Sequence, residues 1–346
     1  MTLLTGHPAP ARDRLAIPRL RSSRHGRSAW CSRAIRVSAA LLISALAAQR
    51  AGAAPTPAQF PTAHVKVKVN LVTVVTSVLD AAGRPVADLP RQAFRIDQDG
   101  RPQKIAVFER ETNLPLDLVL MVDTSLSAFG ELKFEREAAE HFLRQVLRPG
   151  DRAAVFTFAY HVDELSPFTG NLRRLDAALA RMRSGTGTSL FDAVFLGSRA
   201  LAARPPGHRR VLLLVTDAGE TTSRTTYDAA RDAAVRSGAM LYTILIRAVR
   251  SENGRNTAGE HALDTIIDST GGATLPVYSP GQFGPTFSRI NEELRTEYLL
   301  GYYPDPEPAP GSYHQIRVRL ALSGAENAAK YRLEYRKEYF VLEASP

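Results

Sequence analysis

The feature that most constrains the fold is a set of short, almost wholly apolar segments separated by amphipathic stretches. Residues 116–122, 210–216 and 240–246 are such segments, and they are typical of parallel strands that are buried on both faces. Between them, apolar residues recur three or four positions apart, which indicates helices packed on a core. Strands that alternate with helices in this way predict an α/β fold with a doubly wound, mostly parallel sheet.

Further elements follow from the same patterns. Residues 153–158 read as another strand of this sheet. The apolar periodicity predicts helices near 132–146, 171–182, 189–203, 227–237, 263–269 and 283–295. Asn171 is expected to cap the second of these helices, because its short side chain can accept from a backbone amide of the first turn.

The segments on either side of this α/β region have β character. The stretches 65–79, 298–303, 316–322 and 331–335 read as strands, and Asp99-Gly100 predicts a hairpin turn between 94–97 and 104–108. Residues 304–311 contain four prolines and read as a loop. Neither flank, 64–110 or 298–346, is large enough for a stable sandwich by itself. We therefore expect the two flanks to pair into one β-sandwich, with residues 115–297 inserted between them.

The first 53 residues resemble a secretory signal peptide. They hold nine arginines and one acidic residue, an apolar stretch over 37–48, and the small residues Ala51 and Ala53 of an A-x-A cleavage pattern. Residues 54–63 read as a Pro-rich linker. We expect an exported protein of the periplasm, the cell surface or the extracellular space that keeps no membrane span after cleavage; an uncleaved anchor is the alternative.

The charge of the chain belongs mainly to that leader. The whole chain has a net charge of +9, but residues 54–346 hold 35 basic and 34 acidic side chains. A nearly neutral chain lacks the basic footprint of a nucleic-acid-binding protein. The single cysteine, Cys31, excludes both an internal disulfide framework and a Cys-rich zinc site.

Oxygen-bearing side chains follow two of the buried strands. Asp123, Ser125 and Ser127 come directly after 116–122, and Asp217 follows 210–216. Thr188 lies in the loop that opens the helix at 189. Ligands bind at the carboxyl ends of strands in open α/β sheets, and such oxygens suit Mg²⁺, with Mn²⁺ or Ca²⁺ as alternatives.

Two other residues compete for roles at this site. Thr186 is an alternative hydroxyl in the loop of Thr188, and Glu220 is either an outer acceptor or a solvated loop acid. The sequence shows no nucleophile elbow, no evident Ser/His/Asp order and no histidine spacing typical of a metal site.

Together these motifs resemble the von Willebrand factor type A domain over about residues 115–297. Asp-x-Ser-x-Ser at Asp123, the Gly-Thr loop around Thr188 and the Val-Thr-Asp strand end at Asp217 match its metal-ion-dependent adhesion site. Leu190-Phe191-Asp192-Ala193 strengthens the match. The resemblance departs at Ala218, where glycine commonly follows the aspartate.

The resemblance implies a Rossmann-like fold and a non-enzymatic role. Asp123, Ser125, Ser127, Thr188 and Asp217 would hold Mg²⁺, and an acidic side chain of a protein ligand would fill an open coordination position. It also implies that ligand capture shifts the last helix, 283–297. An architectural envelope protein and, less favoured, a metal-dependent hydrolase are the alternatives. The sequence leaves the oligomeric state open.

Overall fold

The computed structural model describes residues 71–110, 113–126, 132–247, 256–322 and 330–342. The chain divides into two units, 1–65 and 66–346, and every described residue belongs to the second. The predicted signal peptide, linker and first strand residues (65–70) lie outside the described residues. Among the described residues, no helix is both long and apolar enough to span a membrane.

A six-stranded sheet forms the centre of the α/β region, in the order β10-β9-β8-β5-β6-β7. All its neighbouring strands are parallel except β7, which runs antiparallel to β6 at one edge. The mostly parallel α/β fold predicted from the apolar segments is therefore confirmed. The strands are β5 (Leu116–Asp123), β6 (Arg152–Phe158), β7 (Val162–Thr169), β8 (Arg209–Thr216), β9 (Met240–Ile246) and β10 (Thr274–Val277).

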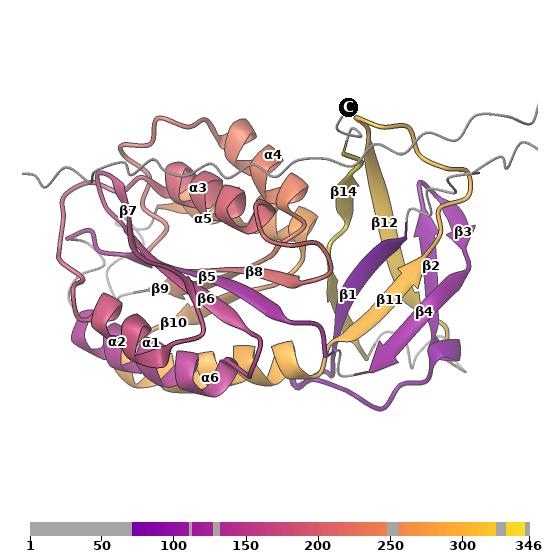
Figure 1. Ribbon diagram of the computed structural model, residues 1–346, viewed down its shortest axis with the longest axis horizontal. Helices are drawn as coiled ribbons and strands as arrows, with labels where there is room; N and C mark the ends of the chain where they lie inside the picture. The colour runs from indigo at the N-terminus through magenta and orange to yellow at the C-terminus, as the bar shows by residue number, and fades with distance from the viewer. Residues whose placement is uncertain (1–70, 111–112, 127–131, 248–255, 323–329, 343–346) are drawn as a thin grey trace, which may run out of the picture. The chain divides into compact units, whose positions relative to one another are not determined.

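Helices cover both faces of this sheet (Figure 1). One face packs against α1 (Leu132–Val146), α2 (Leu172–Leu179) and α6 (Phe283–Arg295), and the other against α3 (Leu190–Ala202), α4 (Tyr227–Ser237) and α5 (Thr257–Thr270). Each face encloses its own cluster of buried apolar side chains. Asn171 caps α2 as expected, since its side chain accepts from the Arg174 amide.

Two four-stranded antiparallel sheets combine strands from both flanks of the α/β region. One has the order β13-β1-β11-β4 and the other β14-β12-β2-β3. Their inner faces share one apolar core, in which Phe94 and Tyr298 lie 4.9 Å apart between ring centroids. The strands are β1 (Val72–Leu79), β2 (Phe94–Gln98), β3 (Arg101–Gln103), β4 (Ile105–Arg110), β11 (Tyr298–Tyr302), β12 (Tyr313–Leu320), β13 (Arg332–Tyr335) and β14 (Glu338–Phe340).

The predicted hairpin at Asp99-Gly100 is only partly correct. Both residues have positive φ, 49° and 78°, as a tight two-residue hairpin turn requires. The partner of β2 is the short β3, whereas β4 crosses to the other sheet and pairs with β11. A local turn signal fixes the reversal of the chain but not how far the returning strand continues in the same sheet.

Several elements have no counterpart among the predictions. The edge strand β7 contains a proline and exposed polar residues, and β10 and β14 are three or four residues long, so none has a strong apolar pattern. Helix α5 begins at Thr257 and not at 263, because Asn256 caps it by accepting from the Gly259 amide. Two single-turn 3₁₀ helices, at Arg91–Ala93 and Pro280–Gln282, complete the described elements.

The contact between α1 and α6 gives a first test of the core. Phe142 of α1 is fully buried and stacks on Phe287 of α6, with ring centroids 4.8 Å apart. Phe142→Ala is expected to lower the free energy of unfolding by about 3–5 kcal/mol, because it removes the ring and leaves a cavity. Phe134→Ala on the same helix is the control, since that side chain is 50% exposed. Equal losses in chemical denaturation would contradict this packing.

Gly272, where α5 turns into β10, gives a second test. Its φ is +96°, and a Cβ there would lie 2.2 Å from the carbonyl oxygen of Leu241. Gly272→Ala is expected to destabilise the protein by more than the roughly 1–2 kcal/mol of backbone strain alone. Gly284→Ala is the control: this glycine of α6 has open space around it, so the change should stabilise the helix by about 1 kcal/mol. Gly272→Ala should therefore lower the Tm of the protein, and Gly284→Ala should raise it.

Candidate functional site

Asp123 is the last residue of β5, and its carboxylate is fully buried. Val122 pairs with Val215 of β8, so Asp123 and Thr216 lie side by side where the two strands end. The Thr216 hydroxyl donates to Asp123 Oδ2 over 2.7 Å, and the Ser125 amide donates to Asp123 Oδ1 over 2.9 Å. Both carboxylate oxygens are therefore held in fixed positions.

The pKa of Asp123 is raised to about 6. Burial is the main cause, and the negative charge of Asp217 acts in the same direction, while hydrogen bonds from Thr216 and Ser125 act against it. A buried carboxylate that faces a second carboxylate is unfavourable in its charged form. A positive group between the two carboxylates would relieve that cost.

Ser125 brings a second loop to Asp123. It forms an isolated parallel bridge with Gly185, and the Gly185 amide donates to the Thr124 carbonyl over 2.8 Å. A Cβ at Gly185 would lie 2.7 Å from that of Ala159, which directly follows β6, so the close approach of this loop to the end of β6 needs glycine. The bridge brings the loop that contains Thr188 alongside the strand end of Asp123.

Thr188 is held in turn by the loop that follows β8. Its amide donates to the Thr221 hydroxyl over 2.8 Å, and its carbonyl accepts from the Thr221 amide over 2.9 Å. Thr188 Oγ1 and Asp217 Oδ1 each lie 3.1 Å from the position that a Cβ would take at Gly219. The two oxygens are therefore at most twice that distance apart. Asp217 also accepts from the Gly219 amide over 3.0 Å.

Four of the five predicted ligands thus belong to three loops that contact one another: Asp123 and Ser125, Thr188, and Asp217. The fifth, Ser127, lies outside the described residues. Thr216 and Thr221 were not predicted, although both support the site. In the sequence, Thr216 is only a hydroxyl at a strand end and Thr221 only a hydroxyl in a loop. Neither can be assigned to the site until the register of β5 and β8 is known.

The structure places Thr186 and Glu220, the two residues that compete for roles at this site, in different surroundings from the predicted ligands. Thr186 is exposed, whereas Thr188 is buried. Glu220 accepts from the Phe191 amide in the first turn of α3 and from both the amide and the hydroxyl of Ser223. Its carboxylate is therefore not a solvated loop acid, because it stabilises the start of a helix.

Ala218 lies in a strained conformation. Its φ is 61°, in the left-handed region where glycine is common, and the residue is fully buried. This left-handed conformation costs a non-glycine residue roughly 1–2 kcal/mol. The Ala218 amide donates to Thr216 Oγ1 over 3.0 Å, so the hydrogen bonds around the strand end hold the turn despite the strain.

The donor set fits a small, hard dication. Its described members are two carboxylates and two hydroxyls, and nowhere in the described ranges do three or more His, Cys, Asp or Glu side chains gather into a possible metal site. Oxygen donors with few negative charges suit Mg²⁺, which keeps several of its own waters. The same set is poor for zinc, which prefers nitrogen and sulfur.

Solved structures resemble the chain at low sequence identity. A von Willebrand factor type A protein from Catenulispora acidiphila is 12% identical with a TM-score of 0.47, and the match covers 80% of this chain and 76% of that one. The conserved hypothetical protein BatB from Bacteroides thetaiotaomicron is 15% identical with a TM-score of 0.42 (52% and 100%). The von Willebrand factor domain of the type V pili tip protein Mfa5 from Porphyromonas gingivalis is 13% identical with a TM-score of 0.43 (52% and 95%).

No curated protein matches the chain. Residues 118–220, however, match the family described as the von Willebrand factor type A domain. This stretch runs from β5 through β8 to Glu220 and includes Asp123, Ser125, Thr188 and Asp217. On this match, residues 118–220 carry a von Willebrand factor type A domain.

Proposed function

We propose that the von Willebrand factor type A domain binds a divalent cation, Mg²⁺ foremost, and uses it to capture an acidic side chain of a protein ligand. The observation that supports this most strongly is the convergence of Asp123, Ser125, Thr188 and Asp217 on three adjoining loops. Ser127 would join them. The cation would supply a positive centre with a free coordination position for an external carboxylate.

The donor set leaves room for an external ligand. Asp123 and Asp217 supply two negative charges, which offset but do not exceed those of a dication, and the hydroxyls of Ser125 and Thr188 are neutral. A cation held in this way keeps exchangeable waters. A carboxylate from a partner can replace one of them and form a charge-assisted contact at the edge of the sheet.

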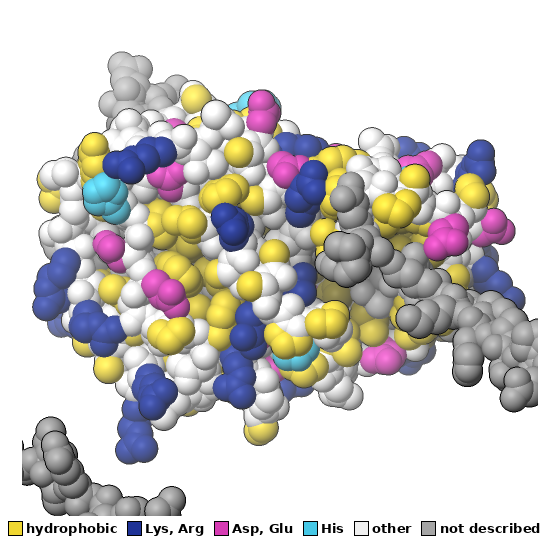
Figure 2. Space-filling view, turned by 45° about the horizontal axis from the view of Figure 1, so that its top comes forward, with side chains coloured by type: hydrophobic (Ala, Val, Ile, Leu, Met, Phe, Trp, Pro, Cys, Tyr) yellow, Lys and Arg dark blue, Asp and Glu magenta, His cyan; other side chains and the backbone are white. Residues whose placement is uncertain are grey.

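A hydrolytic role for this metal site is less well supported. Hydrolysis needs a general base near the metal, and the nearby carboxylate of Glu220 is engaged with Phe191 and Ser223 at the start of α3. A nucleic-acid ligand is also disfavoured. Figure 2 shows basic side chains scattered over the visible face among acidic and apolar ones, without a continuous basic stripe.

Export belongs to the same proposal. The arginine-rich start, the apolar stretch over 37–48 and the small residues after it direct the chain to the periplasm or cell surface.

Removing one hydroxyl tests the metal site. Thr188→Val keeps the size and shape of the side chain but deletes a donor, and it is expected to weaken Mg²⁺ binding by roughly tenfold or more in calorimetric titration. Thr186→Val is the matched control, because Thr186 lies in the same loop with an exposed side chain. Loss of binding in the control alone, or in neither variant, would show that the cation is not bound as proposed.

Cation-dependent capture tests the ligand. A partner retained from an envelope extract by the wild type in Mg²⁺ should be lost with a chelator and with Thr188→Val, but not with Thr186→Val. Replacing the acidic residues of the captured partner by their amides should then abolish retention. A partner that is still retained in the presence of the chelator and by Thr188→Val would rule out the metal site as the docking point.

A further inference from the structure

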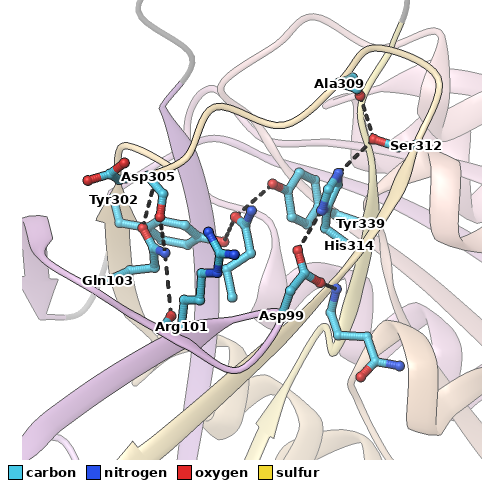
Figure 3. A network of polar contacts seen from close by, with 11 residues as sticks. Asp99, Arg101, Gln103, Tyr302, Asp305, Ala309, Ser312, His314 and Tyr339 are labelled. Carbon is cyan, nitrogen blue, oxygen red and sulfur yellow. Dashed lines mark hydrogen bonds and ion pairs between the residues drawn. The ribbon is translucent and has the colours of Figure 1, made fainter.

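Three side chains in the β-sandwich form a hydrogen-bonded chain of hydroxyl, imidazole and carboxylate (Figure 3). Ser312 Oγ lies 2.6 Å from His314 Nε2, and His314 Nδ1 lies 2.7 Å from Asp99 Oδ2. All three residues belong to elements outside the von Willebrand factor type A domain. The order and the atoms correspond to the general arrangement of a serine nucleophile, its base and the group that orients the base.

The local backbone explains how two of these groups meet. Ser312 directly precedes β12 and His314 is its second residue. Side chains two residues apart along an extended chain share a face. Tyr313 between them is 44% exposed. Gly311 and Ser312 are anchored by β-type hydrogen bonds to Val341, of 2.8 and 3.0 Å. The loop that carries Ser312 is therefore fixed beside the imidazole.

The register of β12 and β2 supplies the third group. The Asp99 amide donates to the Gln315 carbonyl over 3.0 Å, and the Gln315 amide donates to Asp99 Oδ1 over 2.9 Å. This arrangement leaves Oδ2 for His314. Along the chain 212 residues separate Asp99 and Ser312, so the order of these residues in the sequence does not reveal the array.

The carboxylate is charged and the imidazole ring is supported. Burial raises the pKa of Asp99, but hydrogen bonds from His314 and the Gln315 amide outweigh it and bring the pKa below its ordinary value. The ring of His314 lies 5.5 Å from that of Tyr339. Tyr339 is itself fixed, because its hydroxyl and that of Tyr302 both donate to Gln98 Oε1 over 2.9 Å.

The array lies beside a cavity of about 710 Å³. Its wall includes Tyr339, on which His314 packs, and Val341, whose amide donates to the Ser312 carbonyl over 3.0 Å. Ser312 is partly exposed beside this wall. The wall combines the charged side chains of Glu307 and Arg336 with the apolar side chains of Pro308, Pro310 and Leu342. The apolar part of the wall fits a substrate with a short hydrocarbon part.

We propose that Ser312, His314 and Asp99 form a second functional site that hydrolyses carboxylic esters with a short apolar acyl group. Ser312 Oγ bonds to the carbonyl carbon while its proton passes to His314 Nε2. The bond from that carbon to the alcohol oxygen then breaks, and His314 returns the proton to the departing alcohol. Water, deprotonated by the same nitrogen, attacks the acyl-serine and releases the acid and the free hydroxyl.

The hydroxyl proton has a competing acceptor. Ser312 Oγ also contacts the carbonyl oxygen of Ala309, and a serine that donates there only ties the loop to the strand. The reactive form is the one that donates to His314, which requires the His314 proton to be on Nδ1. The Asp99 carboxylate selects that tautomer, since it can only accept from this nitrogen.

The experiment uses the full exported chain, a fluorophosphonate probe and p-nitrophenyl butyrate. Mass spectrometry should locate the probe on Ser312 of the wild type. Ester turnover should fall to background in Ser312→Ala and by about tenfold or more in Asp99→Asn. Asparagine also tolerates the left-handed backbone of position 99 and can accept from the Gln315 amide, so Asp99→Asn tests the charge with little change in fold.

His141→Gln is the control for general imidazole catalysis, because His141 is an exposed histidine of α1 that takes no part in the array. Its turnover should equal that of the wild type. Absence of the probe from Ser312, or equal turnover in Ser312→Ala and wild type, would overturn the proposal. A lower Tm in both array variants with no labelling of the wild type would identify the array as a structural tie only.

Discussion

The structure of the α/β region depends on one strand, β5, which has a parallel neighbour on each side. The chain passes from β5 to β6 on one side and later returns to β8 on the other, so the order of strands reverses at this point. Loops that leave adjacent strands at such a reversal diverge and open a space above the sheet edge. Asp123 lies at this place, and its buried carboxylate is tied to β8 through Thr216.

The β-sandwich needs both flanks of the α/β region for its completion. Its two sheets each contain strands from before and after the insertion, so neither flank can bury its apolar face without the other. Polar contacts also join the two regions. Arg231 of α4 pairs with Glu338 of β14 over 2.7 Å, and the Lys337 amide donates to the Ser269 carbonyl over 2.9 Å. Burial of apolar surface and these contacts link the regions within one unit.

The sequence predicted the long, strongly patterned elements and missed the weak ones. Residues 210–216 predicted β8 because this segment is almost wholly apolar and gives the strand no polar face. Strand β7 has exposed residues along its length, and its place at the sheet edge comes from pairing with β6. The sequence predicted that residues 104–108 pair with 94–97 across the Asp99-Gly100 turn. In the structure β4 instead pairs with β11, in the other sheet of the sandwich. Short or edge strands are decided by their neighbours and not by their own pattern.

For the sites, the sequence alone determined which side chains follow the buried strands and therefore which oxygens are available at the sheet edge. It did not determine the supporting role of Thr216, the strained turn at Ala218 or the use of Glu220 at the start of α3. It also held no sign of the contact between Asp99 and His314. Those features depend on strand register and loop contact between residues far apart along the chain, and only the tertiary structure fixes these distances.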